Sequence, residues 1–112
     1  GDARLPIKLG FAVPLADPQP DGLPTVKENA RLGEIEDVIV RAVGDRTPGV
    51  FALAITTHGM REFVFYVPER VDFGELHDAI ERAVGTHEVQ CMAEHDAAWQ
   101  AYRDFAMAER DA

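Results

Sequence analysis

The chain contains no serine, and Cys91 is its only cysteine. Without serine, a Ser-His-Asp nucleophilic centre is excluded. A single thiol forms no internal disulfide and no cysteine-based metal site, so a reducing compartment is the simpler expectation. The chain opens without a charged-then-apolar leader, and we expect a cytoplasmic location; a leader upstream of Gly1 is left open.

Long apolar runs and positive charge are also scarce. No apolar run reaches ten residues, whereas about 20 are needed to span a bilayer, so no membrane partner is expected. Eleven basic residues against 20 acidic ones give a formal charge of −9, which repels phosphate backbones. An RNA-binding sheet also needs two or three stacking aromatics, and only Tyr66 is available here. We therefore expect no nucleic acid partner.

What the chain does contain is enough for one core. Its 112 residues and 46% hydrophobic content are typical of one globular unit. We find no repeat, low-complexity tract or interior boundary. The prediction is a single α+β domain over residues 1–112, with its core in about residues 5–105.

Alternating apolar residues predict strands at 5–15, 50–57, 61–67 and 87–95. For the middle two we predict a three-residue connection that pairs Thr57 with Arg61. That register puts all large apolar side chains on one face, whereas a two-residue loop would set Ile55 opposite a glutamate. By parity, the inward-facing groups are Phe51, Leu53, Ile55, Phe63, Phe65 and the inert thiol of Cys91.

Two capping boxes, at Thr25 and Asp72, predict helix starts, because each has a glutamate three residues later. Apolar residues follow at helical spacing until Gly44 and Gly85, which we expect to act as C-caps. Asp96 precedes a third helical stretch and is expected to cap it through the N–H of one of the next residues, Ala98 or Trp99.

The order strand-helix-strand-strand-helix-strand predicts a ferredoxin-like βαββαβ fold, with an additional C-terminal helix. Right-handed crossovers put two helices on one face of a four-stranded antiparallel sheet, with the first and third strands central. The C-terminal helix or a second copy is expected to cover the other face. That face is predicted to carry Lys8, Gly10, Ala12, Ala52, Ala54, Thr56, Glu62, Val64, Tyr66, Gln90 and Met92.

Motifs for phosphate loops, metalloproteases and nucleophile elbows are missing from the sequence. We therefore predict no catalytic residue, no cofactor and no metal; the adjacent His95 and Asp96 point apart on a strand. Trp99 and Tyr102 share one helix side and are expected to anchor that helix rather than stack on a ligand. The candidate functional surface consists of His58, Arg61, Tyr66, Asp96, Trp99 and Tyr102.

Three segments resemble a bacterial family known as domain of unknown function 695. They are the Ile-Glu-Asp helix at 35–37, the Thr-x-x-Gly-x-Arg hairpin leading into Phe-Tyr at 56–66, and Asp-x-x-Trp-x-x-Tyr at 96–102. The resemblance covers roughly residues 24–105, with Ala97 where the family usually has proline. It implies no activity.

More loosely, the acidic α/β layout and the closing Asp-x-x-Trp-x-x-Tyr are similar to protein regulators of ribonuclease E activity, which act by binding an enzyme. Our first hypothesis is therefore a non-catalytic protein-interaction or regulatory module that binds another protein or a second copy of itself. The alternative is a small enzyme or ligand-binding domain with a cleft near the hairpin and the C-terminal helix. A deep pocket with converging polar groups would favour the alternative.

Overall fold

The computed structural model describes the backbone of residues 2–111 and the side chains of residues 2–108. Apart from their exact bounds, the elements follow the predicted order. They are β1 (Ile7–Pro14), α1 (Val26–Gly44), β2 (Val50–Thr57), β3 (Met60–Val67), α2 (Phe73–Val84), β4 (Gln90–His95) and α3 (Gln100–Asp111).

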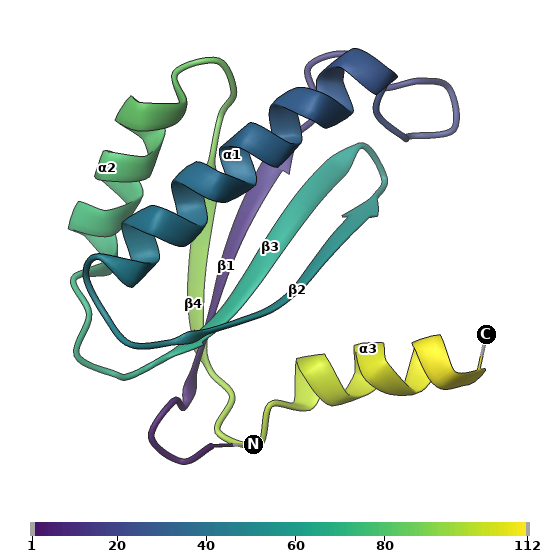
Figure 1. The fold of residues 1–112 in the computed structure, drawn as a ribbon. Coiled ribbons are helices and arrows are strands. Elements are labelled where there is room, and N and C mark those ends of the chain that lie inside the picture. Colours follow the sequence, from purple (N-terminus) through teal and green to yellow (C-terminus); the bar gives the residue numbers. More distant parts are fainter. Residues whose placement is uncertain (1, 112) are drawn as a thin grey trace.

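The four strands form one antiparallel sheet in the order β2-β3-β1-β4. The first and third strands are central, as predicted, so the fold is the ferredoxin-like α+β arrangement. Figure 1 shows α1 and α2 side by side over the sheet, with α3 apart from both. Within residues 2–111, no helix has both the length and the apolar composition needed to cross a bilayer.

The main core lies between the sheet and the two covering helices. Phe63 and Phe65 are buried there, as predicted, and Phe65 meets Phe11 edge-on with ring centroids 5.9 Å apart. Alternation on the strands and helical spacing on α1 and α2 bring these side chains together. Fully buried members include Leu9, Phe11, Val13, Leu32, Ile35, Ile39, Phe63, Leu76 and Ile80.

The hairpin register differs from the prediction by one residue. His58 and Gly59 form a two-residue loop with φ of 51° and 77°, and Thr57 pairs with Met60. A two-residue turn with positive φ at both positions has a backbone twist that matches the twist of the two strands it connects. Ile55 therefore lies opposite Glu62, the pairing that the prediction had rejected.

A bulge in β2 compensates for this shift. The register changes between Phe51 and Leu53, so Ala52 is the extra residue. Phe51 rejoins the helix side, where its ring stacks on Phe65 at 4.9 Å. The expectation that Leu53 and Ile55 face the helices is wrong, because β2 changes faces at the bulge. For the same reason Ala54 and Thr56, expected on the other face, lie opposite Phe63 and Arg61 on the helix side.

The helix ends agree with the sequence at three positions out of four. Thr25 and Asp72 accept from the N–H groups three residues on, and Gly85 takes the left-handed conformation with φ of 68°. Gly44 is not a C-cap. Asp45 continues in right-handed geometry and its N–H still reaches the carbonyl of Arg41, so the helix needs no left-handed residue there.

Candidate functional site

The six candidate residues divide into two groups at opposite ends of β3. Arg61 and Tyr66 are five residues apart on one strand, which is about 17 Å, and their side chains point to opposite faces. His58 lies near Arg61, exposed at the hairpin tip. The remaining group, which we call the aromatic anchor, comprises Tyr66, Asp96, Trp99 and Tyr102.

Trp99 is the centre of the aromatic anchor. Its ring lies flat on Tyr66, with centroids 4.4 Å apart and planes at 13°, while Tyr102 meets it edge-on at 6.3 Å. Its indole Nε1–H donates to the carbonyl oxygen of Leu5 at 3.0 Å. These contacts join the start of α3 to both β3 and the N-terminal segment. Figure 1 shows the start of α3 at the lower end of the sheet.

Asp96 caps α3, but through donors two residues later than predicted. Its Oδ1 accepts from the N–H of Gln100 at 2.8 Å, and its Oδ2 accepts from the N–H of Ala101 at 3.2 Å. The N–H of Trp99 instead donates to the backbone carbonyl of Asp96 at 2.9 Å. Trp99 has a φ of 56°, and this left-handed residue closes a turn before the helix begins.

Tyr66 completes the cap. Its hydroxyl donates to Asp96 Oδ2 at 2.8 Å, and the N–H of Tyr102 lies at the same hydroxyl. Burial, together with the hydrogen bond to the Asp96 carboxylate, raises the pKa of Tyr66 to about 12. Burial would also raise the pKa of Asp96, but the donors from Gln100, Tyr66 and Ala101 outweigh it and lower that pKa. At neutral pH the pair is therefore a neutral donor and a charged acceptor.

The hairpin group, His58 and Arg61, has no contact role in the aromatic anchor; instead Arg61 connects the hairpin to α1. The Arg61 guanidinium donates through Nη2 to Asn29 Oδ1 at 2.8 Å, and through Nε to the hydroxyl of Thr56. Asn29 belongs to α1, so Arg61 connects the hairpin to the helical layer. The structure therefore does not bring His58 and Arg61 together with the aromatic anchor.

A buried carboxylate–histidine pair was missed by the sequence reasoning. Glu28 and His87 have side chains only 6% and 7% exposed, and His87 Nε2 lies 2.8 Å from Glu28 Oε2. The same carboxylate accepts from the backbone N–H groups of Ala16 and Asp17. Burial opposes the charge, but His87 and the two N–H groups lower the pKa of Glu28. We call this set the Glu28 clasp.

Hydrogen bonds extend from the clasp to the surface. Arg31 Nε donates to the hydroxyl of Thr86 at 3.0 Å, and that hydroxyl lies 3.0 Å from His87 Nδ1. A hollow of about 280 Å³ opens beside the pair. Nothing local in the sequence signals this arrangement, because Glu28 was interpreted as a capping-box residue and His87 lies 59 residues away. The clasp joins the loop after β1, helix α1 and the α2–β4 connection.

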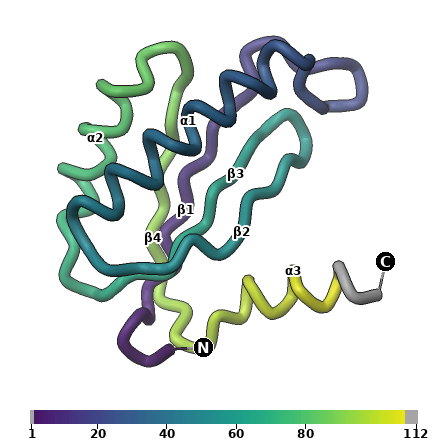
Figure 2. The backbone as a smooth tube through the Cα atoms, in the orientation of Figure 1, coloured from purple at the N-terminus to yellow at the C-terminus, as the bar shows by residue number. Residues whose placement is uncertain are grey.

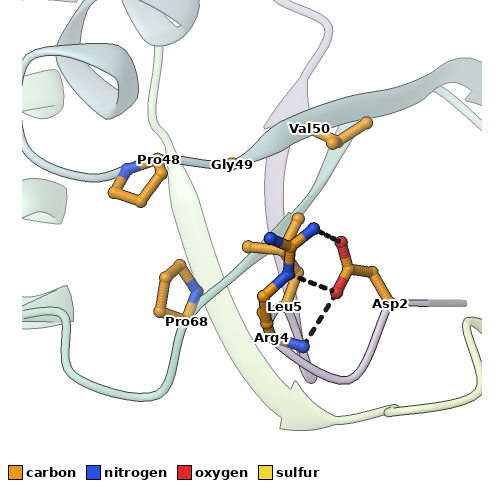
Figure 3. Close-up of a pocket in the computed structure, with 7 residues that line it drawn as sticks. All are labelled: Asp2, Arg4, Leu5, Pro48, Gly49, Val50 and Pro68. Carbon is orange, nitrogen blue, oxygen red and sulfur yellow. Dashed lines mark hydrogen bonds and ion pairs between the residues drawn. The ribbon is translucent and has the colours of Figure 1, made fainter.

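The largest hollow that we describe lies elsewhere. It measures about 410 Å³, and Figure 3 shows its lining from the N-terminal segment, the start of β2 and the end of β3. Its cation, Arg4, is already paired with Asp2 at 3.1 Å. None of the six candidate residues lines this hollow or the hollow beside the Glu28 clasp.

Neither a metal centre nor a reactive thiol is evident in the part of the chain that the structure describes. No three His, Cys, Asp or Glu side chains gather there as ligands for an ion. Cys91 faces inward, as predicted, and packs half-buried against the core. Burial raises the pKa of its thiol, which disfavours the reactive thiolate.

The fold and the aromatic anchor define an α+β chain of ferredoxin-like topology whose C-terminal helix is pinned at its first turn. The chain belongs to the family of unknown function DUF695, whose profile matches residues 3–107. This match confirms the resemblance inferred from the three segments. No curated protein and no solved structure matches the chain. The looser similarity to regulators of ribonuclease E activity stays a prediction.

Proposed function

We propose that this protein is a non-catalytic interaction module that binds another protein through its open face. The open face is the side of the sheet turned away from α1 and α2. Two adjacent rows of paired residues form its middle. One row is Met92, Gly10, Val64 and Leu53, and the other is Gln90, Ala12, Glu62 and Ile55.

One observation carries this proposal: an exposed apolar side chain, Met92, lies beside acidic residues on the open face. Met92 is 64% exposed at the β4 end of the first row, whereas Val64 in that row is buried. Glu62 and Glu94 lie beside Met92, together with Lys8, which is paired with Glu94 at 3.1 Å. The chain as a whole carries a formal charge of −9. A partner suited to this surface would offer an apolar side chain surrounded by lysine or arginine, because complementary charge directs association.

The state of the polar groups supports a non-catalytic role. In the described residues, no buried side-chain nitrogen or oxygen lacks a hydrogen-bond partner. Tyr66 and Asp96 are engaged in capping α3, and Glu28 is engaged by His87 and two backbone donors. The alternative of an enzyme with a cleft beside the hairpin and α3 finds no support in the two hollows described above, since neither contains a residue of α3.

Affinity capture from a lysate of the native cells tests this proposal. The bait is the parent chain beside Met92→Asp, with Val26→Asp as the matched control, because Val26 is 92% exposed at the start of α1. We expect one protein to be retained by the parent and by Val26→Asp, and its affinity for Met92→Asp to fall at least about tenfold. Equal retention by all three baits would contradict the role of the open face.

A further inference from the structure

The outer edge of β2 is an unusually unprotected sheet edge. β2 is an end strand of the sheet, and Figure 2 shows it as the outer border. Its sequence, Val-Phe-Ala-Leu-Ala-Ile-Thr-Thr, contains no charged residue and no proline. Val50 and Phe51 are 40% and 37% exposed. Natural edge strands usually carry charges, prolines or bulges that prevent pairing with another chain.

The two edges of the sheet differ. β4, the opposite edge, has six residues and carries Glu94 and His95. In β2 the bulge at Ala52 is the only protective device, and it affects one end. The stretch Leu53–Thr57 pairs regularly with β3. This stretch is therefore available as a template for another strand.

The two-residue hairpin determines which backbone groups point outward. Thr57 and Met60 flank the loop, so they exchange hydrogen bonds with each other. In an antiparallel pair such positions alternate, so the N–H and C=O groups of Ala54 and Thr56 point away from β3. A second β2 strand placed antiparallel, with a two-fold axis at Ile55, sets Ala54 of one copy opposite Thr56 of the other. Each of these two pairs then exchanges two hydrogen bonds.

We propose that two copies of this chain associate through the outer edge of β2, around a two-fold axis at Ile55, into one continuous sheet. Two chains of charge −9 repel each other over most of their surface. The Leu53–Thr57 stretch lets them meet where every residue faces an uncharged one, with Ile55 against Ile55. Pairing β2 with β4 instead would be head-to-tail and would not close, whereas two-fold pairing closes as a dimer.

This dimer does not depend on the proposed function, because it uses the edge of β2 rather than the open face. Sedimentation equilibrium over a wide concentration range tests it. For the parent we expect a concentration-dependent rise from the 12.3 kDa chain mass to twice that mass. Ile55→Lys should weaken the dimer at least about tenfold through like charges at the axis. Met92→Lys adds the same charge near the opposite edge and should leave the dimer unchanged while impairing partner capture.

Disulfide trapping provides a second readout that does not depend on weakening the fold. Directly opposite residues in a non-hydrogen-bonded pair have Cα atoms about 4.5 Å apart, which suits a disulfide. In a Cys91→Ala background, Ile55→Cys should form a covalent dimer on mild oxidation. Met92→Cys, exposed near the other edge, should not. A parent that stays monomeric throughout, or equal trapping at both positions, would overturn the proposal.

Discussion

Trp99 has a backbone conformation that residues other than glycine rarely adopt. Its φ of 56° is left-handed, a region that costs roughly 1–2 kcal/mol for residues with a Cβ. Stacking on Tyr66 and the hydrogen bond to Leu5 hold it there. Such strain persists only where surrounding contacts determine the geometry. The indole is therefore the contact that sets where α3 begins.

Removing that indole should destabilise the protein. We expect Trp99→Ala to lower the free energy of unfolding by about 3 kcal/mol, the low end for buried aromatics, because the ring is only partly buried. Tyr102 is 38% exposed, so Tyr102→Ala should lower the free energy of unfolding by clearly less than Trp99→Ala does. Chemical denaturation of the parent and both variants measures this. If Trp99→Ala unfolds at the same denaturant concentration as the parent, Trp99 does not serve as an anchor.

The Glu28 clasp predicts acid sensitivity. The pKa of Glu28 is lowered in the folded chain. Its carboxylate therefore adds to the free energy of unfolding above its unfolded pKa of about 4.3, and this stabilisation is lost as pH falls through the folded pKa. We expect Glu28→Gln to lower the free energy of unfolding by about 1–3 kcal/mol at pH 7, because buried hydrogen-bond donors lose a charged acceptor. The difference from the parent should shrink below about pH 4.

Denaturation curves between pH 3 and pH 7 measure that difference. Glu34→Gln is the matched control, since Glu34 is 68% exposed on the same helix and forms only a 3.6 Å surface pair with Arg31. Its effect should stay within about 0.5 kcal/mol at every pH. A Glu28→Gln penalty that does not change with pH would show that the carboxylate charge is not what stabilises the clasp.

At the scale of elements, β2 and β3 show how turn chemistry overrides a periodicity argument. The two-residue loop forces Ile55 opposite Glu62, and the bulge at Ala52 then returns Phe51 to the core. The loop position His58 is occupied by a residue with a Cβ at a φ of 51°. Asparagine or glycine is preferred at that position, so the hairpin is less stable than this turn allows.

His58→Asn should therefore stabilise the protein. Asparagine tolerates the left-handed region, so we expect the free energy of unfolding to rise by about 0.5–1 kcal/mol. Thermal unfolding of the parent and the variant measures this. Gly59→Ala should have the opposite sign, because that residue has a φ of 77°. Destabilisation by His58→Asn would contradict the view that the left-handed conformation of His58 limits the stability of the hairpin.

For the whole molecule, charge and aromatic placement act together against nucleic acid binding. The formal charge is −9, and Tyr66 is fully buried beneath Trp99. Single-strand binding needs both a positive groove and exposed rings on which bases stack. The open face has neither a net positive charge nor a free Tyr66 ring.

Fluorescence anisotropy with labelled RNA and single-stranded DNA tests this at physiological salt. We expect no saturable binding up to a protein concentration well above the micromolar range. The titration should stay flat for the parent and for Met92→Asp alike, because neither carries the required groove. A sub-micromolar Kd for any oligonucleotide would contradict the prediction.

The sequence by itself determined the element order, the α+β class and most of the inward-facing side chains. The apolar residues alternate along β1 and β3 and recur at helical spacing along α1 and α2. Because these patterns involve only neighbouring residues, they can be identified from the sequence. The positions of Thr25, Asp72 and Gly85 at helix ends followed from local hydrogen bonding. The family resemblance rested on the same local segments.

Only the tertiary structure decided which groups meet across the chain. β2 has apolar residues suited to either face, so hydrophobic pattern alone could not choose its register; the loop and the bulge chose it. The position of Trp99 is set by its contacts with Tyr66 and Leu5, and Glu28 pairs with His87, which lies in the α2–β4 connection. These contacts depend on distant segments being brought together by the packed sheet and helices, a relation that periodicity along the chain does not contain.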